Sequence, residues 1–250
     1  LADLSRSTLE VLEWASCMNH TFSVALLSGC TGHSRANIQL ELLTAEQNHR
    51  IPKGLLEAYG CAHDRIQQVL AQNIEPIRLE RIHQTIGLYL ARQLGWPSGS
   101  RIGDDAYLLE AADHLRAARI RPDQIPGWGA LELVLLFQAA GSKSQDLLAY
   151  DRALTYDRLA LEYLDLSEQD EQHSAIRLDL LVAATAAAYR SGQFAAMDDF
   201  ASQGLLQSKK PLDQARIIEI QIDRLTTGNH YREAFQLAKS VLSKLDIHFP

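Results

Sequence analysis

Apolar residues recur every three or four positions through most of this chain, which is the spacing of one face of an amphipathic helix. The first such face comprises Leu4, Thr8, Val11, Ala15 and Met18. Runs with the two-residue alternation of a strand are rare, and the good helix formers Ala and Leu are abundant. The pattern therefore predicts an all-α protein.

Residues 1–60 predict a small module of three short helices and a hairpin. The second helix is expected to start by Phe22 and to end at Gly29. The third is expected to begin at Ser34, and the Pro- and Gly-containing segment 51–59 is expected to form a β-hairpin or loop. This order of elements is typical of a winged-helix module.

Two more helices are predicted on either side of a break at residues 73–76. Asp64 precedes the first apolar pattern and is a good N-cap, because its carboxylate accepts from amide groups of the first turn. Pro76 suits the first turn of the next helix, where its missing amide hydrogen has no partner to lose. Later helices are expected over residues 104–119 and 130–140, the second of them apolar on nearly all sides and deeply buried.

An aromatic residue followed by small residues is repeated three times in the C-terminal part. The copies are Tyr150, Ala153, Asp157 and Ala160; Phe194, Met197, Ala201 and Gly204; and Tyr231, Ala234, Ala238 and Val241. Longer helices are predicted before them, over residues 131–140, 175–190 and 212–227, with turns at Gly192 and Gly228–Asn229. Small residues let the two helices of a hairpin approach closely, as in tetratricopeptide repeats. We therefore expect a winged-helix-like module over residues 1–75 and a tetratricopeptide-like α-α superhelix over residues 76–250.

Composition limits the classes of function. The first 100 residues hold 8 Lys and Arg against 9 Asp and Glu, and the rest hold 16 against 22, so neither half offers the basic surface of a general phosphate binder. No apolar run approaches the ~18 residues that a membrane span needs. Three scattered cysteines favour a reducing compartment over a disulfide framework. We expect a cytoplasmic protein and, since the chain begins at Leu1 without Met, a piece of a longer one.

Catalytic motifs are missing from the sequence. No complete P-loop, H-E-x-x-H, G-x-S-x-G or kinase catalytic loop occurs. Residues 141–144 (GSKS) resemble only the end of a P-loop and are expected to form a bend between helices. The pairs Cys17/His20 and Cys30/His33 have a spacing that zinc could use, but Cys17 equally suits a small apolar packing role at a helix end. We expect no cofactor, no metal and no enzymatic activity in this chain.

Residues 63–70 (HDRIQQVL) followed by residues 82–90 (IHQTIGLYL) resemble a segment of large bacterial multidomain signalling ATPases of the STAND/AAA type, which are fused to kinase and sensor domains. The matching positions are His63, Asp64, Arg65, Gln67, Gln68, His83, Ile86 and Gly87. Residues 15–22 and 242–250 also agree with that family. The resemblance implies a winged-helix-like module and a tetratricopeptide-like array between an ATPase domain and later output domains.

Two sets of residues are candidate contact sites. The resemblance implies that His63, Asp64 and Arg65 contact a neighbouring ATPase domain; a helix cap with a structural ion pair is the alternative. On the first helices of the repeat, Arg177, Gln221, Asp223 and Arg224 are polar candidates for a concave binding face, with an ordinary solvated helix surface as the alternative.

Three functions remain open from the sequence, and one of them is an effector-binding receptor whose helical array encloses a small molecule. The first is a non-catalytic regulatory or scaffolding fragment of a multidomain signal-transduction ATPase, such as a sensor kinase, which relays state between ATPase and output domains through protein–protein contacts. Its partners would be domains of the same chain and a peptide or small effector on the helical array. The alternative is a DNA-binding transcription-activator fragment with effector-sensing helical repeats, in which Arg35, Asn37 and Gln39 of the third helix would face DNA.

Overall fold

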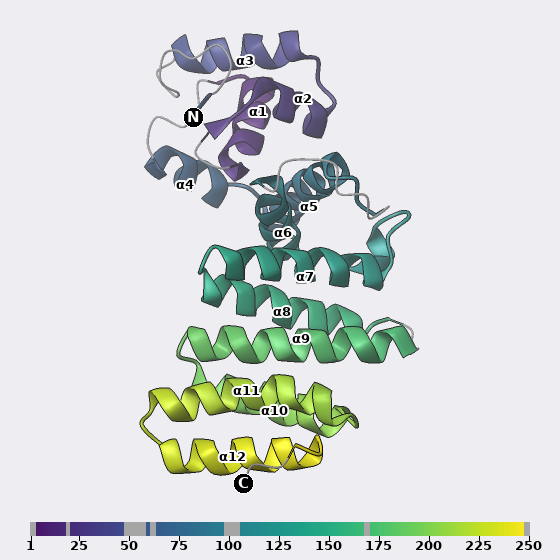
Figure 1. The fold of residues 1–250 in the computed structure, drawn as a ribbon. Helices are drawn as coiled ribbons and strands as arrows, with labels where there is room; N and C mark the ends of the chain where they lie inside the picture. Colours follow the sequence, from purple (N-terminus) through teal and green to yellow (C-terminus); the bar gives the residue numbers. More distant parts are fainter. Residues whose placement is uncertain are drawn as a thin grey trace. The chain divides into compact units, whose positions relative to one another are not determined.

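The computed structural model describes residues 4–18, 21–47, 59–60, 64–97, 106–167 and 171–247 (Figure 1). Within these ranges the fold is helical apart from one antiparallel pair of two-residue strands, so the prediction of an all-α protein is confirmed. In chain order the elements are α1 (Arg6–Cys17), β1 (Thr21–Phe22), α2 (Val24–Thr31), α3 (Arg35–Gln47), β2 (Tyr59–Gly60), α4 (Asp64–Gln72), α5 (Pro76–Gln93), α6 (Ala106–Ala117), the short 3₁₀ helix η1 (Pro122–Gln124), α7 (Ala130–Asp146), α8 (Tyr150–Leu164), α9 (Glu171–Arg190), α10 (Phe194–Gln207), α11 (Pro211–Thr227) and α12 (Tyr231–Lys244).

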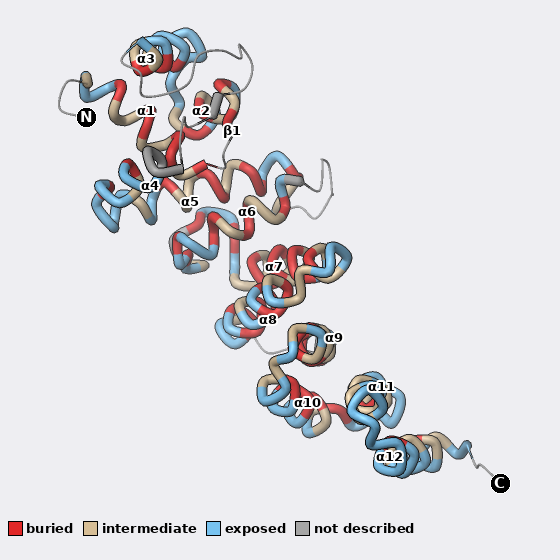
Figure 2. The backbone as a smooth tube through the Cα atoms, turned by 90° about the vertical axis from the view of Figure 1, so that its left-hand side faces the viewer, coloured by how far each residue is buried: buried red, intermediate tan, exposed pale blue. Residues whose placement is uncertain are grey.

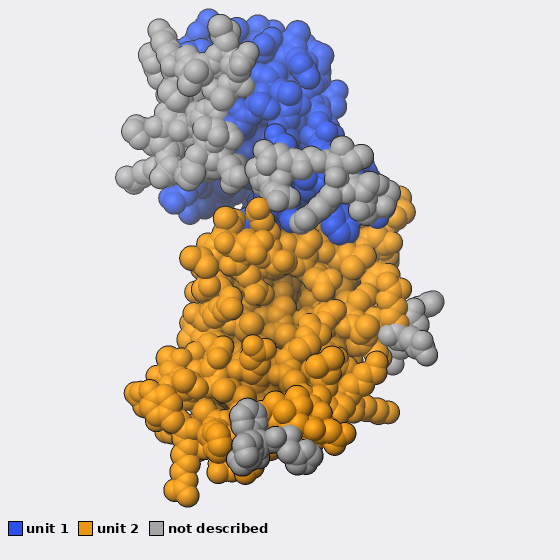
Figure 3. Space-filling view, viewed as in Figure 1, with its two compact units in different colours: residues 1–121 blue, residues 122–250 orange. Residues whose placement is uncertain are grey.

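The chain divides into two compact units, Leu1–Arg121 and Pro122–Pro250 (Figure 3). The sequence pattern placed the boundary between residues 75 and 76, so it assigned α5 and α6 to the repeat region. In the structure both helices cluster with the first unit, because α5 contacts α1 and α2 and forms a close pair with α6. Gly87 permits that pairing, since a Cβ there would overlap the Leu115 side chain of α6.

Helix α1 follows the predicted register. The Ser5 hydroxyl caps it by accepting from the Thr8 amide at 3.0 Å, and Thr8, Val11 and Ala15 are buried on its inner face. Pro76 occupies the first turn of α5, also as expected.

The second helix differs from its predicted bounds at both ends. Phe22 lies in β1, paired with Tyr59, and the helix begins only after Ser23, whose hydroxyl accepts from the Leu26 amide at 3.0 Å. At the other end, Gly29 is not a terminator. It is required because a Cβ there would overlap the Tyr89 ring of α5. The helix instead ends at Gly32, which adopts the left-handed conformation with φ 74°.

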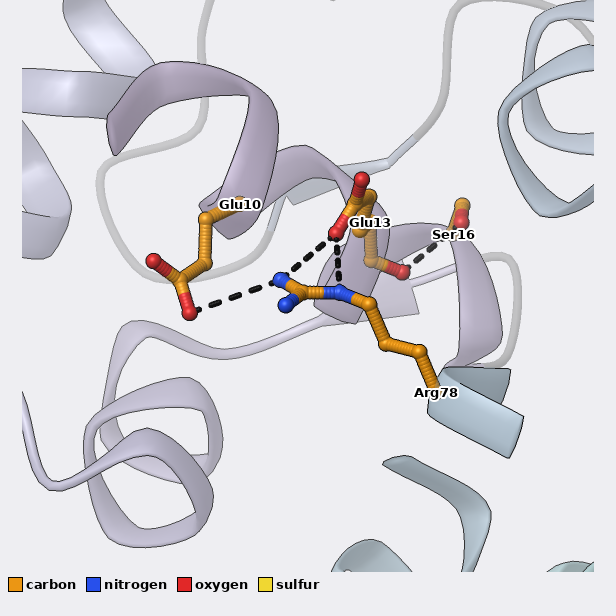
Figure 4. Close-up of polar contacts among 4 residues, drawn as sticks. All are labelled: Glu10, Glu13, Ser16 and Arg78. Atoms are coloured by element: carbon orange, nitrogen blue, oxygen red, sulfur yellow. Dashed lines mark hydrogen bonds and ion pairs between the residues drawn. The ribbon is translucent and has the colours of Figure 1, made fainter. Parts of the chain in front are cut away.

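An arginine ties α5 to α1 in the first unit (Figure 4). Arg78 Nε donates to Glu13 at 2.8 Å, its Nη2 lies 2.7 Å from the same carboxylate, and Glu10 lies 3.4 Å from Nη2. Within α1, the hydroxyl of Ser16 donates to the backbone carbonyl of Glu13, three residues earlier, at 2.8 Å. These contacts hold the start of α5 beside the middle of α1.

Three consecutive hairpins make up the second unit: α7–α8, α9–α10 and α11–α12. Each helix contacts the next one along the chain, and α9 also contacts α7 and α11, the first helices of the neighbouring hairpins. Figure 2 views these helices nearly end-on, with buried positions turned toward the space between them. The repeated small positions of α8 and α10 are buried as expected; among them, Gly204 has no room for a Cβ beside Ile217 of α11.

The three hairpins share one turn. Leu148, Gly192 and Asn229 each have positive φ, at 59°, 75° and 62°, two residues before the aromatic residue that starts the second helix. After each of them the next amide donates to a carbonyl five residues back, at 2.8 Å in all three turns. This is a Schellman-type helix end, which reverses the chain tightly.

The bend expected at residues 141–144 is wrong. These residues lie inside α7, which continues to Asp146. Gly141 has a packing role there, since a Cβ would overlap the Asp157 carboxylate of α8. The buried character predicted for α7 is confirmed, with Leu133, Leu136 and Phe137 fully covered.

Candidate functional site

A groove of about 620 Å³ lies where the second and third hairpins meet. The hairpin turns bring the N-terminal ends of α10 and α12 beside the C-terminal ends of α9 and α11. The groove is lined by Tyr189, Phe194, Met197, Asp198, Gln221, Arg224, Leu225, Thr227, Gly228, His230, Glu233 and Leu237. Its volume is in the range of pockets that hold small ligands or a few side chains of a peptide.

Arg224 organises one wall of the groove. Its guanidinium lies 4.8 Å from the centroid of the Phe194 ring and pairs with the Asp198 carboxylate. Its Nη1 also lies 3.8 Å from Met197 Sδ. The cation is thus shared between an aromatic face and a carboxylate, both from α10, so α10 and α11 are joined along this wall.

Four further lining residues are polar and are called the rim below: Tyr189, Thr227, His230 and Glu233. The Tyr189 and Thr227 hydroxyls are 2.9 Å apart, and His230 Nδ1 lies 3.2 Å from a carboxylate oxygen of Glu233. With Asp198 and Glu233 against Arg224, the lining carries a small formal negative excess. The aliphatic and thioether side chains of the lining, called the floor below, are those of Met197, Leu225 and Leu237.

The groove lining combines apolar side chains with a few polar groups that already have partners. The His230–Glu233 pair has no serine or cysteine among the lining residues to activate, and the Thr227 hydroxyl is bound to Tyr189. In the described ranges no group of three or more His, Cys, Asp or Glu side chains could hold a metal ion. An apolar floor with a few fixed polar groups is the usual composition of a recognition site.

Two of the four residues predicted for a concave binding face line the groove, and the other two do not. Gln221 and Arg224 both line the groove. Asp223, between them on α11, is exposed and does not line it. Arg177 lies on α9 and pairs with Asp165 at the end of α8.

The predicted domain contact around residues 63–65 falls largely outside the described part of the chain. His63 is not described. Asp64 is the first residue of α4 and Arg65 the second, which agrees within one residue with the expected helix start. Their part in a contact with another domain stays a prediction.

Ionisable groups with displaced pKa values lie away from the groove. Burial raises the pKa of Asp157 to about 7, and this side chain lies in the seam between α7 and α8 with one carboxylate oxygen lacking a hydrogen-bond partner. Burial lowers the pKa of His114 to about 4, helped by His83, whose Nδ1 lies 2.8 Å away. Neither Asp157 nor His114 lines the groove.

The thiols considered for a zinc site are poor ligands as they stand. Burial raises the pKa of Cys17 to about 11 and that of Cys30 to about 12, which disfavours the thiolate that zinc requires. Their partner His20 lies outside the described residues.

Most of the groove was not identified from the sequence. Asp198, His230, Glu233 and Tyr189 belong to it only because the hairpins place the start of each second helix beside the end of each first helix. The turns predicted at Gly192 and Gly228–Asn229 carried part of that signal, since they lie just before Phe194 and Tyr231. The sequence pattern did not predict that α10 of one hairpin contacts α11 of the next.

Comparison with protein-family models, with curated proteins and with solved structures finds no match for this chain.

Proposed function

We propose that this chain is a non-catalytic interaction module that binds a polypeptide segment in the groove between its second and third hairpins. The observation that carries the proposal is the groove itself, with its apolar floor, its fixed Arg224 and its polar rim. Successive hairpins, with first helices that contact one another, support a tetratricopeptide-like array, a class of structure that presents such grooves to peptides.

The proposal places the module in a cytoplasmic multidomain signalling ATPase, where it relays state between an ATPase domain and an output domain. The resemblance around residues 63–70 and 82–90 supports this context. The order α1–β1–α2–α3–β2 supports a winged-helix-like arrangement at the front, because a short strand between the first two helices pairs with one that follows the third. In the described part of the chain no helix is both long and apolar enough to cross a bilayer.

Peptide selection tests the groove directly. Random linear peptides selected on the purified protein should bind the Gln221→Trp variant at least about tenfold more weakly, because the indole fills the groove; tenfold corresponds to about 1.4 kcal/mol. Asp223→Trp is the matched control, since that exposed position two residues away does not line the groove. Equal binding to both variants would contradict the proposal.

The absence of catalysis has its own test. The purified protein should release phosphate from ATP no faster than buffer does, because no P-loop is present in the sequence. Turnover that persists after further purification would contradict a purely regulatory role.

A DNA-binding role for the front module is a second candidate. Arg35, Asn37 and Gln39 all lie at exposed positions of α3, where a recognition helix would present them. A mobility-shift assay with a DNA pool at about 50 mM salt tests it, because electrostatic binding is strongest at low salt. A shift that is lost in Arg35→Ala would support this role; no shift would end it.

A further inference from the structure

The outer flank of α12 repeats the surface that α8 uses to hold α9. On α8, residues spaced i, i+4, i+11 and i+15 fall within one narrow arc of the helix. They are Tyr150, Leu154, Leu161 and Asp165. The same spacing counted from Tyr231 selects Phe235 and Leu242 on α12, and then Asp246, which lies two residues beyond the last residue of the helix and has φ 58°. An aromatic residue, two large apolar residues and an aspartate thus recur in the same order.

On α8 both ends of this arc are held by arginines of α9. The Arg190 guanidinium lies 5.4 Å from the centroid of the Tyr150 ring, and Arg177 pairs with Asp165. Between them Leu154 is only 1% exposed and Leu161 is buried. Because Arg190 is at the end of α9 and Arg177 near its start, α9 runs antiparallel to α8.

The seam between α10 and α11 shares the contact between an aromatic ring and an arginine, but its aspartate lies only four residues after the aromatic residue. Phe194 and Asp198 of α10 hold Arg224 of α11, and Leu205 packs with Ile217. An aromatic residue at the start of each second helix therefore receives an arginine from the later part of the following first helix. The rule applies to both seams that the second unit contains.

On α12 the corresponding surface is uncovered. Tyr231 and Phe235 are each 61% exposed, and Asp246 is exposed as well. In the described part of the chain no arginine lies over the Tyr231 ring, whose hydroxyl donates to Asn229 at 2.8 Å. Leu242 is half-buried. The surface has the composition of an interface between helices, and no second helix among the described residues covers Tyr231 and Phe235.

From these contacts we infer that the flank of α12 formed by Tyr231, Phe235 and Leu242, with the exposed Asp246 just after the helix, binds a partner polypeptide as an antiparallel amphipathic helix. That helix carries an arginine near its C-terminal end, which stacks on Tyr231, and a second near its N-terminal end, which pairs with Asp246. We infer a helix as the occupant because α9 covers the matching surface of α8. We infer its two arginines because the surface offers an aromatic ring at one end and an aspartate at the other. This surface is separate from the groove, which is lined by Glu233 and Leu237 of α12 and by His230 just before it.

A peptide copy of α9 is the probe. Residues 171–190, with Ala175→Lys joined to Asp179 by a lactam to hold the helix, are labelled and titrated with the full-length protein by fluorescence anisotropy. Positions 175 and 179 are exposed in α9, so the bridge lies off the contact face. We expect saturable one-to-one binding that Phe235→Ser weakens about tenfold or more; the fold survives this change because Phe235 is already largely exposed.

The arginine contact has a sharper signature. Replacing the peptide's Arg190 with Gln should weaken binding to the wild-type protein about three- to tenfold, and should change little on Tyr231→Ala, where the ring is already missing. Leu206→Ser, at an apolar position 87% exposed elsewhere, and the groove-filling Gln221→Trp should leave binding unchanged. Unchanged peptide affinity of these two variants would show that the peptide binds the flank of α12 and not the groove.

Three results would overturn the inference. One is no saturation at about 1 mM peptide, the weak limit of specific recognition. Another is equal binding to wild type and Phe235→Ser. The last is self-association of the protein in sedimentation that Phe235→Ser abolishes, which would make a second copy the occupant.

Discussion

Asp157 is a carboxylate in a position that the other two repeat copies give to alanine. It is 1% exposed, packs against Gly141, and leaves one oxygen without a hydrogen bond. Its pKa of about 7 means that the folded protein keeps it protonated where the unfolded chain, with an ordinary pKa near 3.8, would ionise it. Stability is therefore unaffected below about pH 3.8, falls as the pH rises through that window, and is lowest above about 7.

Replacing Asp157 with Asn should stabilise the protein at neutral pH. The amide has the same shape and does not ionise, so we expect a gain of about 2–4 kcal/mol in the free energy of unfolding at pH 8, and little difference at pH 4. Urea unfolding at the two pH values measures this. Asp223→Asn, at an exposed site, is the control, and an equal gain at both pH values would contradict the burial argument.

The His83–His114 pair should act in the opposite direction. Both pKa values are lowered, largely by burial, that of His114 to about 4. The pair therefore does not reduce the free energy of unfolding above about pH 6.5, where both imidazoles are neutral in the unfolded chain as well. As the pH falls toward 4, the imidazoles of the unfolded chain become protonated first, and the free energy of unfolding decreases. His114→Asn, made in the Asp157→Asn background, keeps a polar partner for His83 and should flatten the loss of unfolding free energy between pH 6.5 and 4. An unchanged slope would show that other groups cause it.

At the scale of single elements, the repeated pattern predicted the second helices that the structure shows as α8, α10 and α12, each of which starts at the aromatic residue of its copy. The first hairpin turn was missed for a physical reason. A glycine signals a turn only when its backbone needs positive φ, and Gly141 is instead required by the Asp157 side chain. The residue that does adopt positive φ is Leu148, which carries no turn signal.

Leu148 gives a direct test of the shared hairpin turn. It holds φ 59°, a conformation that costs a side chain roughly 1 kcal/mol relative to glycine, and its own side chain is 71% exposed. Leu148→Gly should therefore raise the free energy of unfolding by about 0.5–1 kcal/mol. Gly192→Ala, at the matching position of the next turn, should lower it by a similar amount. Thermal unfolding of both variants decides; destabilisation by Leu148→Gly would mean that the leucine packs in solution.

At the scale of the whole molecule, local periodicity predicted the helices but not which of them cluster. The division at Arg121/Pro122 depends on contacts of α5 with α1 and α2, which no local pattern encodes. The groove likewise depends on contacts between helices that no local sequence pattern encodes. Gln221 and Arg224 were candidates because they are polar residues on a first helix, whereas Asp198 and Glu233 join them only through packing between hairpins.

The most direct test of the groove as a recognition site uses the two methionines of the chain. Met197 lies in the groove floor beside Arg224, and Met18 is buried in the first unit. With ¹³C-methyl methionine labelling, titration of a peptide selected on this protein should shift the Met197 signal to saturation and leave the Met18 signal in place. A bound peptide that moves Met18, or that leaves Met197 unmoved, would contradict the proposed site.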